Sequence, residues 1–139
     1  MKSAKQEELI LAAKQARELA YAPYSHFRVG AALLGINGEI YTGCNVENAS
    51  YCLTICAERV AVFKGVSQGC TDFQALALVT DSEIPASPCG ACRQVLAEFS
   101  PGLSVLMSNL KGKVVHTTLE KLLPDSFSLI KTEEEKINE

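Results

Sequence analysis

The chain has 139 residues, of which 47% are hydrophobic, and a formal net charge of −3. This length suits one domain with a core that needs no disulfide staples. The 13 lysines and arginines are scattered, which disfavours a basic face for a nucleic-acid polymer and favours a small-molecule partner; no apolar run approaches the roughly 20 residues that span a bilayer.

The first part of the chain predicts an amphipathic helix followed by two antiparallel strands. Apolar residues recur at helical spacing over residues 4–20, and Pro23 is expected to end that helix. Residues 28–34 form a nearly continuous run of small apolar side chains. Asn37-Gly38 is a strong two-residue hairpin signal before a second strand over residues 39–42.

The middle of the chain predicts a loop, a buried helix and a buried strand. Residues 45–51 are polar and rich in turn formers, and functional groups often lie on such loops. Residues 54–64 have the length and spacing of a helix, with Gly65 as its expected stop. The apolar run over residues 75–79 is typical of a strand that is covered on both faces.

The last part predicts a helix over residues 89–99 and short strands at 105–107 and 114–115. Because helices and strands alternate from residue 54 onward, we expect helices on both faces of a sheet. The predicted fold is a three-layer α/β/α sandwich around a mixed sheet of about five strands. We expect one catalytic domain over residues 1–130 and a charged, frayed tail over residues 131–139.

The six cysteines are expected to be reduced thiols. The first eight residues are charged and show no secretory signal, so a reducing cytosol and a cytoplasmic location are predicted. Cys44, Cys52 and Cys70 are interpreted as buried small hydrophobic residues.

The other three cysteines have the spacing of a catalytic zinc site. Cys56 opens the sequence C-A-E-R, and Cys89 and Cys92 belong to P-C-G-A-C-R-Q. Catalytic zinc keeps three protein ligands and leaves its fourth tetrahedral position to water. Glu58 lies two residues after the first cysteine, which suits a proton carrier that does not hold the metal. If the cysteines open two helices, the positive helix ends lower the thiol pKa values and favour metal binding.

This pattern matches the known zinc nucleobase-deaminase signature, H-x-E followed by P-C-x-x-C, with Cys56 in place of the histidine. It predicts hydrolytic deamination, with Glu58 as general base and then general acid. Three thiolates leave Zn²⁺ with a net negative charge, so an arginine that donates to thiolate sulfur is expected. Arg59 or Arg93 could donate, and its adjacency to Glu58 favours Arg59.

Several separated motifs together resemble a known family. They comprise residues 23–32 (P-Y-S-H-F-R-V-G-A-A), residues 43–51 (G-C-N-V-E-N-A-S-Y), C-A-E-R, P-C-G-A-C-R-Q and residues 122–124 (L-L-P). Over most of residues 5–127 the chain resembles the short, zinc-dependent cytidine deaminases that work as homotetramers with three cysteine ligands. The resemblance implies a cytidine-deaminase-like fold, one Zn²⁺ per chain, and conversion of free cytidine and 2′-deoxycytidine to uridine and 2′-deoxyuridine, with release of ammonia, in pyrimidine salvage.

The same resemblance implies roles for further residues. Phe27 is expected to stack near the base, and Asn45 and Glu47 to hydrogen-bond the ribose hydroxyls. The backbone of Ala57, together with the carboxylate that follows it, is expected to read the cytosine edge. Val60 stands where threonine is common, which we expect to affect packing more than chemistry. Three positions match those through which neighbouring subunits of this family complete each other's sites: Ala49, Tyr51 and Phe127.

Other functions remain open at this point. A structural zinc site would need a fourth protein ligand, which Cys44 or Cys52 could supply. A thioredoxin-like redox pair would leave C-A-E-R unexplained. Deaminases of blasticidin S share C-A-E and P-C-G-x-C-R-Q, whereas residues 45–51 favour the ordinary nucleoside. An editor of nucleic acid is disfavoured by the net charge and by the lack of a basic, aromatic extension that binds single strands.

Overall fold

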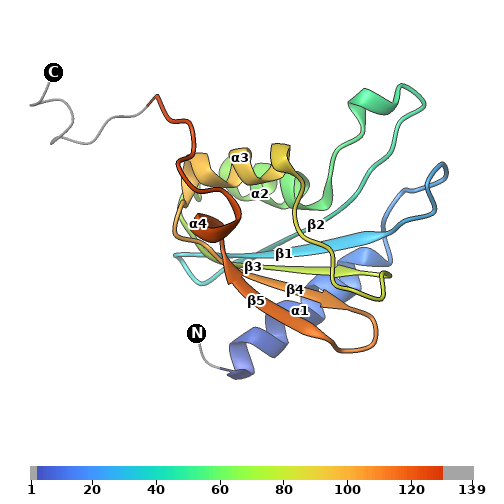
Figure 1. Ribbon diagram of the computed structural model, residues 1–139, viewed down its shortest axis with the longest axis horizontal. Coiled ribbons are helices and arrows are strands. Elements are labelled where there is room, and N and C mark those ends of the chain that lie inside the picture. The colour runs from blue at the N-terminus through green and yellow to red at the C-terminus, as the bar shows by residue number, and fades with distance from the viewer. Residues whose placement is uncertain (1–2, 130–139) are drawn as a thin grey trace, which may run out of the picture.

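A five-stranded sheet with helices on both faces organises the chain in the computed structural model, which describes residues 3–129 (Figure 1). The strands are β1 (Val29–Gly35), β2 (Ile40–Cys44), β3 (Phe73–Thr80), β4 (Ser104–Asn109) and β5 (Val114–Thr118). The helices are α1 (Ser3–Arg17), α2 (Ala57–Ser67), α3 (Gly90–Phe99) and α4 (Leu119–Leu122), with a 3-10 turn, η1, at Tyr51–Leu53. None of the described helices is long and apolar enough to cross a membrane. The tail predicted at 131–139 lies outside the described residues.

The sheet is mixed, as predicted, with the strand order β2-β1-β3-β4-β5. β1 pairs antiparallel with β2 and β3, and β4 pairs antiparallel with β5. Only β3 and β4 run parallel, and α3 lies in the connection between them, because parallel neighbours need a long crossover. The turn between β1 and β2 contains Gly38 at φ +87°, a conformation that favours glycine, which confirms the predicted hairpin.

Two apolar clusters, one on each face of the sheet, form the core and give the molecule its three layers. Leu9 and Ala13 of α1 pack on one face against side chains such as Ala32 of β1. Val62 of α2 and Leu96 of α3 belong to the cluster on the other face. Six consecutive residues of β3, from 75 to 80, are buried, as expected for a strand covered on both sides. The three-layer α/β/α prediction is therefore confirmed.

The end of α2 differs from the prediction. The helix continues past Gly65 to Ser67, and the chain turns at Gly69, which has φ +93°. Gly65 is instead a packing residue, because a Cβ atom there would lie 2.9 Å from Cε1 of Phe73. The glycine lets the helix approach β3 closely, so the same residue type that often stops a helix here allows it to pack.

The other two helix differences lie near the ends of the chain. α1 stops at Arg17, ahead of Pro23, because the backbone of Tyr21 leaves the helix to pair with Val46 in an isolated bridge. The short helix α4 was not predicted. Its first turn is capped by the hydroxyl of Thr118, which accepts a hydrogen bond from a backbone N–H within the helix.

Candidate metal centre and pocket

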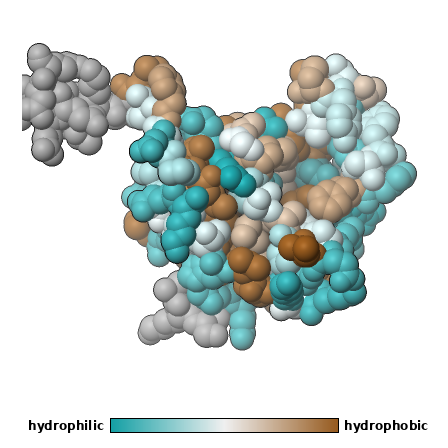
Figure 2. All heavy atoms as spheres, viewed as in Figure 1, coloured by the Kyte–Doolittle hydropathy of each residue, from teal (hydrophilic) through white to brown (hydrophobic). Residues whose placement is uncertain are grey.

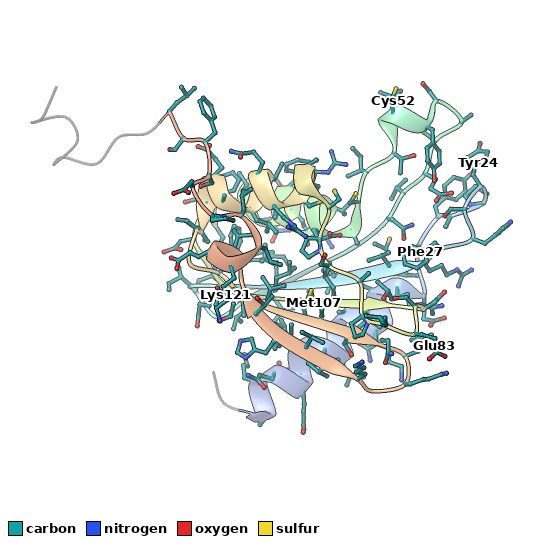
Figure 3. The ribbon with its side chains drawn as sticks, in the orientation of Figure 1. Tyr24, Phe27, Cys52, Glu83, Met107 and Lys121 are labelled. Carbon is teal, nitrogen blue, oxygen red and sulfur yellow. The ribbon has the colours of Figure 1, made fainter. Side chains whose placement is uncertain are left out.

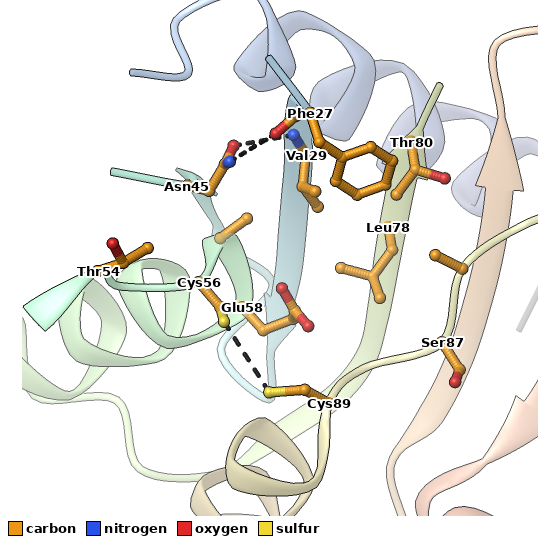
Figure 4. Close-up of a pocket in the computed structure, with 12 residues that line it drawn as sticks. Phe27, Val29, Asn45, Thr54, Cys56, Glu58, Leu78, Thr80, Ser87 and Cys89 are labelled. Carbon is orange, nitrogen blue, oxygen red and sulfur yellow. Dashed lines mark hydrogen bonds between the residues drawn. The ribbon is translucent and has the colours of Figure 1, made fainter. Parts of the chain in front are cut away.

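Two helix N-termini bring three cysteines together. Cys56 is the N-cap residue of α2, Cys89 is the N-cap residue of α3, and Cys92 lies in the first turn of α3. Their sulfur atoms all lie within 4.8 Å of one another. The Sγ atoms of Cys56 and Cys89 are 3.9 Å apart (Figure 4), and those of Cys89 and Cys92 are 3.4 Å apart. The juxtaposition is tertiary, because the two helices are separated in the chain by β3.

The sulfur spacing fits a zinc ion. Zn–S bonds of about 2.3 Å in a tetrahedron place two sulfur atoms about 3.8 Å apart. The distances of 3.9 Å and 3.4 Å bracket that value. Within residues 3–129 the group contains three cysteines, and neither Cys44 nor Cys52 joins it as a fourth ligand. Three thiol ligands with one position left for water are the pattern of a catalytic zinc site rather than a structural one.

The thiols form a hydrogen-bonded group that favours a thiolate at Cys56. Its pKa is lowered to about 5, first by a hydrogen bond from Cys92 and further by Arg59. Arg59 Nη2 donates to Cys56 Sγ at 3.5 Å, which is the geometry that its predicted role requires. The pKa of Cys92 is raised by the same hydrogen bond to Cys56 and by burial. The hydrogen bond from Cys92 and the guanidinium of Arg59 thus favour a thiolate at Cys56 before any metal binds.

Glu58 is buried beside these thiols. It lies in the first turn of α2 and is only 5% exposed. In the metal-free chain, burial raises its pKa to about 7, and the negative charge of Cys56 acts in the same direction. A carboxyl group with a pKa near the working pH can both accept and give a proton, which suits general acid–base chemistry.

The thiols of Cys56 and Cys89 and the carboxyl group of Glu58 face a pocket of about 200 Å³ (Figure 4). Its walls come from the ends of β1 and β3, the start of α2 and the loop that leads into α3. The lining is mostly apolar and consists of Phe27, Val29, Asn45, Thr54, Cys56, Ala57, Glu58, Leu78, Thr80, Ala86, Ser87 and Cys89. A concave, apolar pocket with a few convergent polar groups is the usual form of a small-molecule site.

The pocket lining contains six of the residues that the sequence indicated and several that it did not. The six are Phe27, Asn45, Cys56, Ala57, Glu58 and Cys89. The predictions did not include Leu78 and Thr80 at the end of β3, or Ala86 and Ser87 in the following loop. Only the position of these residues, at and after the carboxyl end of β3, could have indicated them, since ligands in α/β sheets bind beyond the carboxyl ends of the strands.

Asn45 holds the backbone of the segment that carries Phe27. Its Nδ2 donates to the carbonyl of Phe27 at 2.8 Å, and its Oδ1 accepts from the N–H of Val29 at 2.9 Å. Phe27 is 39% exposed at the pocket wall, so its ring is available to a ligand (Figures 3 and 4). The asparagine therefore has a positioning role besides its place in the pocket lining.

Glu47 lies behind the same segment and outside the pocket lining. Its carboxylate accepts hydrogen bonds from the N–H groups of Tyr24 and Ser25, at 3.0 Å and 3.1 Å, and from the hydroxyl of Ser25. Ser25 Oγ in turn accepts from the N–H of Phe27 at 3.0 Å. The pKa of Glu47 is lowered, first by the Ser25 hydroxyl, because these donors favour the charged carboxylate.

The three residues assigned to neighbouring subunits lie outside the pocket of this chain. Tyr51 is 60% exposed in η1 and Phe127 is 70% exposed in the segment after α4, while Ala49 lies on the exposed loop before η1. Hydrophobic side chains lie near the tip of the projecting segment that carries η1 (Figure 2). The carbonyl of Phe127 accepts a hydrogen bond from Gln94 of α3 at 3.0 Å.

One prediction for the remaining cysteines was wrong. Cys70 is buried, as expected, and Cys44 is half-buried. Cys52 is exposed, because η1 projects from the body of the molecule and has no buried residue (Figure 3).

Comparison with known proteins gives consistent results. A family described as the cytidine and deoxycytidylate deaminase zinc-binding region matches residues 3–108. Cytidine deaminase of Sporosarcina psychrophila is 59% identical over 123 residues, which is 88% of this chain and 90% of that protein. Blasticidin-S deaminase of Bacillus cereus is 34% identical over 129 residues, 87% of this chain and 91% of that protein. The structure of cytidine deaminase from Burkholderia pseudomallei matches with a TM-score of 0.86 and 50% identity, over 91% of this chain and 100% of that one.

Proposed function

Since the chain belongs to the cytidine and deoxycytidylate deaminase family, we propose that it hydrolyses free cytidine and 2′-deoxycytidine to uridine and 2′-deoxyuridine, with release of ammonia. The observation that carries this proposal is the cluster of Cys56, Cys89 and Cys92 beside a pocket whose wall includes Cys56, Cys89 and the buried Glu58. A redox pair would have no use for that carboxyl group, and a structural zinc site would have no use for the pocket.

The three cysteines would hold the zinc, and Glu58 would handle the protons. Bound zinc supplies Lewis acidity that makes water nucleophilic near neutral pH. Glu58 takes the proton that the attacking water loses and delivers it to N3 of the cytosine ring. The water oxygen bonds to C4, and Glu58 then moves the proton of the new C4 hydroxyl group to the exocyclic amine. The bond from C4 to that nitrogen breaks, the C4 carbonyl forms, and ammonia leaves. The place of Glu58 in the pocket wall, two residues after the ligand Cys56, suits it to both halves of this transfer.

Phe27, Asn45 and Ala57 line the pocket where the nucleoside would bind. We propose that Phe27 stacks on the base and that the backbone of Ala57 forms hydrogen bonds with the cytosine edge. Asn45 forms a hydrogen bond with a ribose hydroxyl. A carboxylate has about four acceptor sites, and the turn before Phe27 uses three on Glu47. One site therefore remains with which Glu47 can accept a bond from ribose.

The assembly that we propose is a homotetramer in which Ala49, Tyr51 and Phe127 complete the sites of neighbouring subunits. The high exposure of Tyr51 and Phe127 supports this, because large aromatic side chains are enriched at interfaces. Sedimentation equilibrium of the active enzyme tests it, and a fully active monomer would contradict both the tetramer and the shared sites. A cytoplasmic role in pyrimidine salvage, without a nucleic-acid or membrane partner, completes the proposal.

The direct test of substrate is a comparison of kcat/KM for cytidine, 2′-deoxycytidine and blasticidin S with the zinc-loaded protein, followed by the change in ultraviolet absorbance. We expect both nucleosides to be used far better than blasticidin S. A preference for the antibiotic would replace the proposed substrate and leave the deamination chemistry in place. Binding of zinc without turnover of any of the three would contradict the chemistry itself.

A further inference from the structure

Arg93 follows Cys92, the last cysteine of the metal motif. Its side chain does not donate to a thiolate sulfur, the role considered for it from the sequence, but to oxygen acceptors. Nε donates to the carbonyl of Pro88 at 2.8 Å, and one terminal nitrogen donates to Ser87 Oγ at 3.0 Å. The other terminal nitrogen donates to the carbonyl of Leu122 at 2.7 Å. Among the hydrogen bonds of residues 3–129, this guanidinium has none to a cysteine sulfur.

The three acceptors belong to two separate segments. Ser87 and Pro88 form the loop that leads directly into Cys89 and α3, and Ser87 is part of the pocket wall. Leu122 is the last residue of α4, the short helix that directly follows β5. A guanidinium presents its N–H groups in a rigid planar fork, so one side chain fixes both segments relative to the start of α3. A lysine ammonium at the same position would be a single point donor and could not hold all three acceptors in this geometry.

Of the three thiols, the one that depends on this fork is Cys89. Cys92 is buried inside the helix at 0% exposure, and Cys56 is fixed by α2 and contacts Arg59. Cys89 is exposed and lies at the junction of loop and helix. The next residue, Gly90, also lacks packing support, since a Cβ atom built there would have nothing within 4 Å. The backbone before Cys89 is therefore held by the burial of Pro88 and by the hydrogen bonds of the fork to Ser87 and Pro88.

We propose that Arg93 is a positioning residue that holds Cys89 at the metal-binding point and couples the metal loop to the C-terminal segment at Leu122. The inference rests on the proposed function only in taking Cys89 as a metal ligand. Groups that orient metal ligands typically change metal affinity by about 10- to 100-fold when they are replaced. That range is the effect expected for loss of the fork.

The test compares zinc affinity in the full-length wild type, Arg93→Lys and Arg28→Lys, by competition with a chromophoric chelator. Arg28→Lys is the matched control, because it makes the same exchange at an exposed arginine. We expect Arg93→Lys to bind zinc about 10- to 100-fold more weakly and the control to match the wild type. Ser87→Ala, which removes one acceptor and keeps the charge, should show a smaller loss in the same direction.

A second readout separates positioning from general damage to the fold. If Arg93 acts through Cys89, excess free zinc restores kcat of Arg93→Lys toward the wild-type value, because the occupied site holds the loop. Zinc affinity of Arg93→Lys within twofold of the wild type would overturn the proposal, as would lost activity that excess zinc does not restore. Failure of the deaminase assignment has a different signature, which is tight zinc binding by the wild type with no turnover of cytidine.

Discussion

Replacement of Gly43 by alanine tests whether the close approach of α2 to the sheet sets the geometry of the site. Gly43 lies on β2 beneath the first turn of α2. A Cβ atom there would lie 2.4 Å from the carbonyl oxygen of Ala57, 2.6 Å from the amide nitrogen of Ala61 and 3.0 Å from Cβ of Val60. Two of these three atoms belong to backbone, which cannot rotate away. Relief of the shortest contact to an ordinary 3.4 Å requires the helix to move by about 1 Å.

That displacement would move the proposed metal ligand Cys56 and the proposed proton carrier Glu58, because these two residues flank Ala57. A misplacement of about 1 Å can cost about 100-fold in rate, and overpacking of this kind costs about 1–3 kcal/mol of stability. We therefore expect Gly43→Ala to lower kcat about 100-fold at saturating zinc and to lower the free energy of unfolding in urea by about 1–3 kcal/mol. Gly102→Ala is the control, since its Cβ would meet only a flexible side-chain oxygen at 3.7 Å. Wild-type kcat and stability in Gly43→Ala would refute the reasoning.

Three further perturbations have definite expected results. The pKa of Glu47 is lowered by its donors, so the charged form stabilises the fold above the unfolded pKa of about 4.3, and this contribution disappears as the pH falls through the lowered value. The difference in urea stability between wild type and Glu47→Gln should thus be constant above about pH 4.3 and shrink as the pH falls below it; a difference that stays constant there would contradict the role of its charge. Phe27→Ala should raise KM for cytidine about 5- to 150-fold, the equivalent of about 1–3 kcal/mol of base stacking, and an unchanged KM would exclude the ring from the base site. Removal of zinc by a chelator should abolish activity and lower the melting temperature, and added zinc should restore both; turnover by the zinc-free protein would contradict the assigned chemistry.

The sequence predicted the layers and the five strands from short-range signals, and it predicted the metal group, whose contacts are tertiary, from its match to a known motif. The hairpin at Asn37-Gly38 and the alternation of strands with helices are such signals, and they lead to the observed sheet. Cys89 was predicted at the start of a helix and is the N-cap residue of α3. The helix predicted over residues 54–64 begins at Ala57, so that Cys56 is its N-cap residue. Pattern was sufficient where the relevant contacts are local or where a known motif encodes them.

Contacts between distant segments that no motif encodes could not be predicted from the sequence. Gly65 was taken as a helix stop because its packing against Phe73 is tertiary. The acceptors of Arg93 include a carbonyl 29 positions away at Leu122, which no motif encodes. The hydrogen bonds from residues 24 and 25 to Glu47 depend on the same kind of long-range contact.

The sequence also could not show which of the cysteines outside the metal motif are exposed. Cys52 and Cys70 both looked like small hydrophobic residues in sequence. Cys70 lies in the core beneath the sheet end, whereas Cys52 projects on η1. Composition alone could not distinguish them, because exposure depends on whether the segment leaves the body of the fold.

The central claim is that Glu58 moves protons in a zinc site built by three cysteines, and the most direct measurement is cytidine turnover by wild type and Glu58→Gln, with bound zinc measured in both. The amide keeps the shape of the side chain but cannot exchange the proton. We expect one zinc ion per chain in both proteins and a fall in kcat of about 100- to 10,000-fold in the variant. Retention of zinc with nearly wild-type turnover in Glu58→Gln would contradict the account.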